Sequence, residues 1–330
     1  MTNDSSSADS QMSVGAVTNS PSLLQTVFMG PDGLRAGWRL LIYLPLVFAL
    51  SRTSTFVIRH IAPIRDWLSS QPTTVIAAGP MIFQEIISFL IVLIPALIMM
   101  KIEKRPFAEY GLPAEEAFGK KFWQGVPFGF AMMTLLMVLI SVFRGYSMEG
   151  IGAGGSEAVK YAILYAIGFL FVGFFEEFGF RGYVQSALAS GIGFWPSALI
   201  LSFLFGYVHL GNPGEAKIGA FMAGSFGLLA SFSLCRTGSL WFAVGMHAAF
   251  DWTETYFYGV PDSGLLAQGH LLNSSFHGPV WLTGGSVGPE GSYLVFGVLI
   301  LSAVAIHFMF PAKEQAAKPA TLDDPTVPRL

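Results

Sequence analysis

The chain has little cysteine and little charge, and both shortages narrow what it can be. Cys235 is the single cysteine among 330 residues, which excludes an intrachain disulfide and a metal cluster with several cysteine ligands. Charged residues make up only 12% of the chain and the formal net charge is −3, so nothing indicates a nucleic-acid partner. A P-loop, a glycine-rich dinucleotide fingerprint and a repeat of solenoid length are also lacking. Hydrophobicity is therefore the informative signal.

An excess of apolar residues indicates that the chain is solvated by a lipid bilayer. Hydrophobic residues make up 53% of the sequence and the mean hydropathy is +0.57, far above an ordinary soluble domain. A spanning helix needs about 20 largely apolar residues. Candidate spans lie at about 38–58, 80–100, 122–143, 161 into the 180s, 194–210, 218–234, 240–258 and 292–310. The sequence thus predicts an all-α fold, a polytopic membrane helix bundle of about eight transmembrane helices.

The two ends of the chain differ from this apolar centre. Residues 1–30 are rich in Ser, Asp, Asn and Thr and have no basic start, which predicts a disordered N-terminal tail rather than a signal peptide. Residues 312–330 carry Lys, Asp and Pro and predict a C-terminal tail. Between them we expect a single transmembrane domain, residues 31–311, with its chemistry-bearing core at 161–258.

The distribution of basic residues predicts the orientation. An eight-span arrangement puts 12 of the 18 Lys and Arg on the side shared by both tails. The segment 259–291 contains neither Lys nor Arg, as expected of an external loop. By the positive-inside rule both tails are predicted to be cytoplasmic, and in a prokaryote the membrane would be the cell membrane.

Two adjacent carboxylates and an arginine interrupt the fourth span. An ionisable side chain in hydrocarbon costs at least about 2.5 kcal/mol, so each one within a span is a functional candidate. Glu177 and Arg181 are four residues apart, which predicts an ion pair on one helix face. Glu176 points about 100° away and has no partner in its own helix, which makes it a candidate base. The alternative is a structural polar cluster between helices.

Histidines follow in two later spans. His209 ends the fifth span, where a lone histidine is more commonly interfacial. His247 and Asp251 have the i, i+4 spacing, so the carboxylate is placed to orient the imidazole, or else to tie helices together. At 1.5 Å per residue, Glu176 and His209 are expected at a similar depth, whereas His247 lies too near its turn to meet them without tilt.

Taken in order, these residues form three motifs. They are Glu176-Glu177 with Arg181, then Phe205 with His209, then His247 with Asp251. The series resembles the CAAX-protease and bacteriocin-processing family of membrane proteins (the CPBP or Abi family), related to type II CAAX prenyl endopeptidases. The match covers about 75 residues, and segments 34–39 and 109–112 resemble the upstream region less specifically. Asp251 stands where many members have Asn.

The resemblance implies an intramembrane endopeptidase that hydrolyses a peptide bond with an activated water. Glu176 would be the general base, assisted by His209, while His247 and Asp251 would bind the oxyanion or position the water. The supporting residues would be Glu177, Arg181 and Phe205, of which the first two hold the helix geometry. The substrate would be a CAAX-type peptide, another peptide or a membrane protein.

The chemistry of these side chains leaves the metal question open. His209 and His247, together with Glu176 or Asp251, would make a Zn²⁺ set with an open water position. A metal-free glutamate mechanism is the alternative, and Asp251 at the Asn position slightly favours a metal or a charged histidine partner.

Two other classes of function remain alongside the protease. A proton- or ion-coupled transporter would also carry Glu, His and Arg inside the membrane, although the sequence shows no inverted repeat. A non-catalytic member that binds a partner protein or confers immunity is the third class. Dependence of proteolysis on Glu176 would separate the first class from the other two.

Overall fold

The computed structural model describes residues 27–30, 33–72, 75–211 and 217–311. The tails predicted for 1–30 and 312–330 lie outside these residues, apart from 27–30. The helices are α2 (Ala36–His60), α3 (Ala62–Ser69), α4 (Ala78–Glu103), α5 (Lys120–Val142), α6 (Gly155–Arg181), α7 (Tyr183–Ile192), α8 (Phe194–His209), α9 (Lys217–Thr237), α10 (Trp241–Trp252), α11 (Val280–Thr283) and α12 (Leu294–Met309). The predicted all-α class is confirmed.

Short elements connect these helices. One-turn 3-10 helices are η1 (Phe107–Tyr110), η2 (Ala114–Glu116) and η4 (Pro289–Gly291), and η3 (Thr253–Phe257) is a π-helix. The strands are β1 (Met29–Gly30), β2 (Gly33–Leu34), β3 (Val75–Ile76), β4 (Tyr146–Ile151), β5 (Leu266–Ala267) and β6 (Leu272–Phe276). β1 pairs with β2 and β4 with β6 in antiparallel ladders, while β3 and β5 are parallel.

Each of the eight predicted spans is helical, but not all are long. Five helical segments of the described chain are long and apolar enough to cross a membrane: α2, α4, α5, α6 continued by α7, and α9. α8 and α12 are shorter apolar helices, and α10 has 12 residues. The chain is therefore an integral, multi-pass membrane protein, while the count of eight spans stays a prediction.

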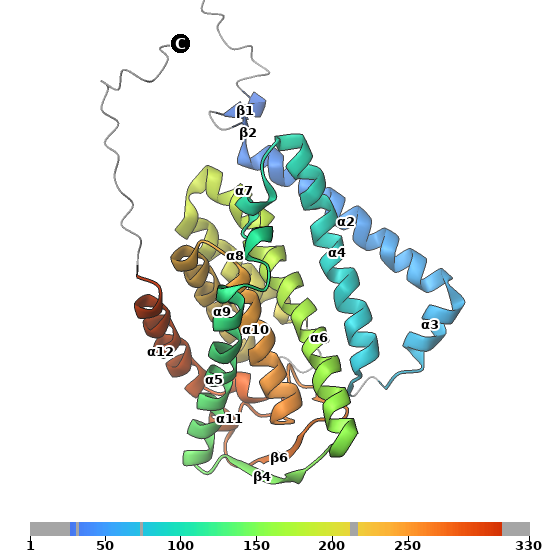
Figure 1. Cartoon of the computed structure of the whole chain (residues 1–330), viewed down its shortest axis with the longest axis vertical. Helices are drawn as coiled ribbons and strands as arrows, with labels where there is room; N and C mark the ends of the chain where they lie inside the picture. Colours follow the sequence, from blue (N-terminus) through green and yellow to red (C-terminus); the bar gives the residue numbers. More distant parts are fainter. Residues whose placement is uncertain (1–26, 31–32, 73–74, 212–216, 312–330) are drawn as a thin grey trace, which may run out of the picture.

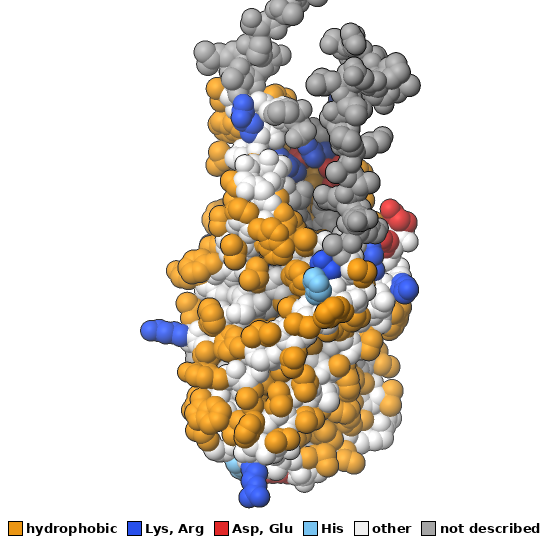
Figure 2. Space-filling model, turned by 90° about the vertical axis from the view of Figure 1, so that its left-hand side faces the viewer, with side chains coloured by type: hydrophobic (Ala, Val, Ile, Leu, Met, Phe, Trp, Pro, Cys, Tyr) orange, Lys and Arg blue, Asp and Glu red, His pale blue; other side chains and the backbone are white. Residues whose placement is uncertain are grey.

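The outer surface of the bundle is apolar, as a protein surrounded by lipid requires. Phe203 and Phe308 are 72% and 77% exposed. Figure 2 shows hydrophobic side chains spread over the flank of the molecule, with Lys and Arg mostly in the upper half of the view. Because water would not favour so broad an apolar surface, this flank is suited to contact with acyl chains.

The bundle has two distinct ends (Figure 1). At the tail end, Arg236 at the end of α9 donates to the carbonyl oxygens of His307 and Phe310 at the end of α12, at 2.8 and 2.6 Å. At the other end, called the loop end here, β4 after α5 pairs with β6 from the long segment 259–291. Residues 27 and 311, where the described part of the chain begins and ends, thus lie opposite this β4–β6 ladder, at what is called the tail end here.

A buried polar cluster fixes the start of α2 at the tail end. Arg39 contacts Glu103 at the end of α4 at 2.8 Å and donates to Ser190 Oγ on α7 at 3.1 Å. Tyr183 OH donates to the same Glu103 carboxylate. Figure 1 shows α2 crossing α4 near this cluster and then diverging toward α3. These polar contacts therefore attach the start of α2 to the bundle, while most of the rest of this helix is exposed on the apolar outer surface.

Glycines let α5 and α10 approach closely. A Cβ at Gly125 would lie 2.2 Å from the Phe242 carbonyl oxygen, and one at Gly129 would lie 1.9 Å from that of Met246. The Gly-x-x-x-Gly spacing on α5 puts both positions on one face, which is a common way to pack helices in lipid. This contact determines where α10, and with it His247, lies in the bundle.

We expect Gly129→Ala to destabilise the protein, because the added methyl group meets the backbone of α10 rather than a movable side chain. Overpacking of this kind costs about 1–3 kcal/mol. Thermal unfolding in detergent should show a clearly lower midpoint. Gly297→Ala on α12 is the matched control, since a Cβ there would meet nothing within 4 Å. Equal midpoints for the two variants would contradict the packing argument.

Candidate active site

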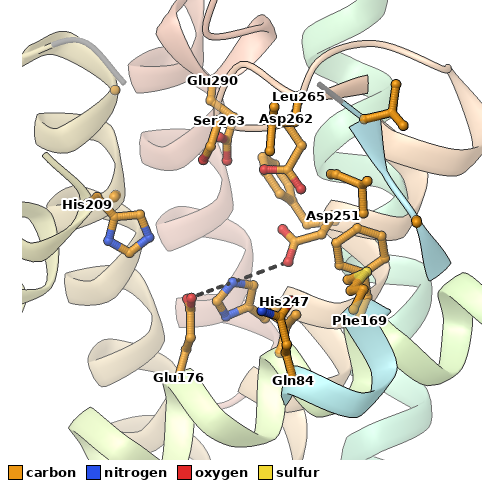
Figure 3. A pocket seen from close by; sticks show the side chains of 18 of the residues that line it. Gln84, Phe169, Glu176, His209, His247, Asp251, Asp262, Ser263, Leu265 and Glu290 are labelled. Carbon is orange, nitrogen blue, oxygen red and sulfur yellow. Dashed lines mark ion pairs between the residues drawn. The ribbon is translucent and has the colours of Figure 1, made fainter. Parts of the chain in front are cut away.

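A cavity of about 530 Å³ lies among α4, α6, α8, α9 and α10. Four residues singled out from the sequence line it: Glu176, His209, His247 and Asp251, with Phe205 beside them. Figure 3 shows these side chains, from three different helices, pointing into one space. The structure therefore brings together the three motifs that the sequence presents in series.

Glu177 lies behind the cavity and holds His247. Its Oε1 accepts a hydrogen bond from His247 Nδ1 at 2.7 Å and lies 3.5 Å from Arg181 Nη1. Both Glu177 and Arg181 are fully buried. The predicted Glu177–Arg181 pair is present. The short bond to His247 comes from Glu177 on the neighbouring helix, while Asp251 lies 3.5 Å from the other ring nitrogen.

The other nitrogen of His247 faces two carboxylates. Its Nε2 lies 3.6 Å from Glu176 Oε2 and 3.5 Å from Asp251 Oδ2 (Figure 3). These separations exceed a direct N–H···O hydrogen bond and suit a water molecule that contacts both sides. Enzymes fix the tautomer of a catalytic histidine in this way: a carboxylate accepts a hydrogen bond from Nδ1, and Nε2 is left to react.

His209 occupies a different wall of the cavity, on α8. Its Nδ1 lies 2.7 Å from the carbonyl oxygen of Phe205, which can only accept, so Nδ1 donates. In the neutral ring Nε2 then carries the lone pair and can accept or relay a proton. The His209 ring also packs on the Phe205 ring at 4.4 Å.

Arg181 is fitted into the bundle by an aromatic ring and a glycine. Its guanidinium carbon lies 4.3 Å from the centre of the Phe205 ring, within range of a cation–π contact. A Cβ at Gly227 on α9 would lie 1.9 Å from Arg181 Nη2. The guanidinium therefore occupies space that only glycine leaves at this point, and Phe205 contacts both Arg181 and His209.

The candidate zinc donors come from three helices, α6, α8 and α10. Among the described residues, no group of three or more His, Cys, Asp or Glu side chains is placed to hold a metal ion. Figure 3 shows His209 across the cavity from Asp251, whereas His247 lies beside Asp251 and Glu176. The zinc set stays a prediction, and no step below uses a metal.

α10 reaches the cavity because it begins inside the bundle. The backbone N–H of Leu240 donates to the carbonyl oxygen of Gly111 at 2.7 Å, and the Trp241 indole donates to that of Pro113 at 2.9 Å. Leu240 and Trp241 are both buried, under the connection between α4 and α5. With α10 starting inside the bundle, His247 reaches Glu176, so the mismatch expected from the sequence is not observed.

The segment 259–291 contributes cavity residues that sequence reasoning missed. Asp262, Ser263, Leu265 and Glu290 line the cavity from this side. Thr255 in the π-helix donates to Asp262 Oδ2 at 3.1 Å. Burial raises the pKa of Asp262, and the charge of Glu176 acts in the same direction. The only sequence signal was the absence of Lys and Arg, which predicts an external loop but not its approach to the site.

We predict that Arg181→Met lowers the free energy of unfolding by about 3–5 kcal/mol, since it leaves the buried Glu177 carboxylate without its cation. Adding Glu177→Gln should restore most of this loss, because the unpaired charge is then removed as well. Chemical or thermal unfolding of the single and double variants in detergent measures the difference. A double variant no more stable than Arg181→Met would contradict the ion-pair account.

Comparison with known proteins agrees with the motifs. Residues 158–253 match the family model described as Type II CAAX prenyl endopeptidase Rce1-like. No curated protein and no solved structure gives a significant match. The matched segment runs from α6 to the start of the π-helix and contains all three motifs. The motif-bearing part of this chain is thus similar to the Rce1-like family of CAAX prenyl endopeptidases, which agrees with the resemblance that its three motifs indicate.

Proposed function

We propose that the chain is an intramembrane endopeptidase in which Glu176 and His247 activate and position a water molecule for attack on a peptide bond. The observation that carries this proposal is the arrangement of His247: buried Glu177 holds Nδ1, while Nε2 faces Glu176 inside the cavity. A structural polar cluster would have no need of a cavity at the free side of the histidine. The Rce1-like match supports the same reaction class.

In the proposed reaction Glu176 is the base. It takes a proton from the water as the water oxygen bonds to the carbonyl carbon of the substrate, with His209 across the cavity assisting. The tetrahedral oxyanion then needs hydrogen-bond donors. His247 in its protonated form supplies one at Nε2 while Nδ1 continues to donate to Glu177. When the C–N bond breaks, Glu176 returns the proton to the leaving amine.

Asp251 has a distinct part in this scheme. It lies 3.5 Å from the same Nε2 atom, one helical turn beyond His247. A carboxylate at this position cannot donate to an oxyanion unless it is protonated, unlike an asparagine amide. We assign Asp251 the role of a third carboxylate that balances the charge of the His247 imidazolium, together with Glu176 and Glu177.

The substrate is proposed to be a peptide or a segment of a membrane protein. The cavity is walled by helices that are themselves embedded, and its apolar lining includes Phe169, Met222 and Phe226. An extended peptide could lie across the cavity with its scissile carbonyl near Glu176. A CAAX-type C-terminal peptide is the substrate class that the family description suggests.

Cleavage of a mass-tagged peptide library by detergent-purified protein tests the proposal. Glu176→Gln should lower the cleavage rate by about 10²- to 10⁴-fold, the usual contribution of a general base. Glu157→Gln is the matched control, since Glu157 is an exposed carboxylate near the start of the same helix α6. His247→Ala should also lose activity, and a chelator should leave the wild-type rate unchanged.

Several outcomes would contradict this account. Equal rates for Glu176→Gln and Glu157→Gln would remove the proposed base. A rate abolished by chelator and restored by Zn²⁺ would replace the metal-free scheme. If wild type leaves all peptides intact and instead shows ion-driven uptake, transport is favoured. If wild type leaves them intact and instead captures a partner stably, even as Glu176→Ala, non-catalytic binding is favoured.

A further inference from the structure

We infer that the cavity selects peptides with a lysine or arginine side chain beside the scissile bond. This inference rests on the proposed function and names a substrate class for the same site. It is drawn from the charges and the hydrogen bonds of the cavity lining, so peptide binding can test it separately from cleavage.

The fixed charges of the cavity lining are all of one sign. Four carboxylates line it, two from the helices and two from the segment 259–291; they are Glu176, Asp251, Asp262 and Glu290. Among the described residues, no Lys or Arg side chain lines the cavity, and the two histidines are its other titratable groups. A cleft whose walls carry charges of one sign concentrates a ligand of the opposite sign. The lining therefore favours a positively charged occupant.

Asp251 has hydrogen-bonding capacity that the folded chain leaves unused. It is only 8% exposed, and it points into the cavity (Figure 3). Within the described part of the chain it accepts no hydrogen bond, and its 3.5 Å contact with His247 Nε2 is too long to be one. Because buried polar groups in proteins are nearly always hydrogen-bonded, we expect the occupant of the cavity to supply donors at Asp251.

Repulsion among the carboxylates favours a cation over water as that donor. Glu176 and Asp251 each lie close enough to Asp262 for their negative charges to repel it. Water can donate hydrogen bonds to these oxygens, but it leaves the like charges unbalanced in a poorly polarisable interior. A lysine ammonium brings three donors and an arginine guanidinium five, each with a positive charge and no acceptor. A basic side chain therefore meets both requirements of the lining.

Asp262 is held in place for this role. It follows the π-helix η3, and the Thr255 hydroxyl of that helix donates to Asp262 Oδ2 at 3.1 Å. Figure 3 shows Asp262 above Asp251, with Ser263 and Glu290 also in the upper part of the cavity and Glu176 in the lower part. The structure thus presents a second group of acidic side chains that faces the proposed catalytic base.

Asp251 places the basic side chain next to the bond that is cut. Its carboxylate lies 3.5 Å from the same His247 Nε2 atom that faces Glu176 at 3.6 Å. A cation held by Asp251 and Asp262 is therefore close to the attacked carbonyl group. Since one extended residue spans about 3.3–3.6 Å, the basic side chain belongs to a residue that adjoins the scissile bond. Its apolar stem can pack on the lining residues Phe169 and Phe226.

Cleavage of matched peptides by detergent-purified wild type tests this selectivity. The peptides are acetylated and amidated at their ends and carry Lys, Arg, norleucine or Glu at one scanned position, with all other residues uncharged. At a position beside the cut, Lys or Arg should raise kcat/KM over norleucine by about 10- to 100-fold, the usual effect of hydrogen bonds to a charged group. Glu should give the lowest value. Equal values for Lys and norleucine at every position would overturn the inference.

Variants of the cavity wall assign the selectivity to the acidic residues. Asp262→Asn should reduce the preference for Lys over norleucine by about tenfold, chiefly by raising KM for the Lys peptide. Asparagine can still accept the hydrogen bond from Thr255, so the substitution removes mainly the charge. Glu290→Gln should act in the same direction, so the test does not depend on one variant folding.

Glu157→Gln is the matched control for net charge, because Glu157 is an exposed carboxylate of α6 that does not line the cavity. It should keep the wild-type preference for Lys. A preference that stays at the wild-type value in both Asp262→Asn and Glu290→Gln would overturn the assignment, and so would an equal reduction in Glu157→Gln.

Binding separates this inference from the proposed function. Fluorescence anisotropy with Glu176→Gln, which leaves the labelled peptides intact and keeps three wall carboxylates, should show about tenfold tighter binding of the Lys peptide than of the norleucine peptide. Equal affinities would contradict the inference. If the affinities differ as expected while wild type cleaves no peptide, the proposed function fails and the selectivity stands. Glu176-dependent cleavage without a basic preference gives the opposite conclusion.

Discussion

The structure depends on one buried carboxylate that serves two helices. Glu177 contacts Arg181 on its own helix and His247 on α10, and all three side chains are buried. A carboxylate without such partners would be too costly inside a bilayer-embedded bundle. Because the guanidinium and the imidazole share it, the position of α10 relative to α6 is set by charge as well as by packing. That link fixes the direction in which His247 Nε2 points.

Small residues make the link sterically feasible. Gly227 leaves room for the Arg181 guanidinium, and Gly125 and Gly129 bring α10 against α5. Phe205 then covers Arg181 and supports His209. In lipid there is little hydrophobic drive to hold helices together, so close backbone contact and buried polar bonds take its place. The buried contacts of the ionisable residues therefore depend on the close helix packing that the glycines allow.

Much of this arrangement could be predicted from the sequence. The helical segments follow from apolar length, and the placing of Glu176, His209, His247 and Asp251 in one cavity follows from three spaced motifs. Glu177 could not be predicted as the hydrogen-bond partner of His247, because the i, i+4 spacing relates only residues of the same helix. The depth of His247 escaped prediction because the start of α10 is set by contacts with the distant α4–α5 connection. Segment 259–291 has no periodic pattern of apolar residues, so its position beside the cavity could not be predicted from the sequence.

The most direct test of direct attack by water is peptide cleavage in H₂¹⁸O with hydroxylamine present, analysed by mass spectrometry. If Glu176 and His247 deliver a water molecule to the carbonyl, the new C-terminus carries one ¹⁸O atom and no hydroxamate accumulates. A hydroxamate at the cleaved bond would show that a covalent acyl intermediate precedes hydrolysis. That result would contradict the account, because its base and histidine would then serve a nucleophile of the protein instead of water.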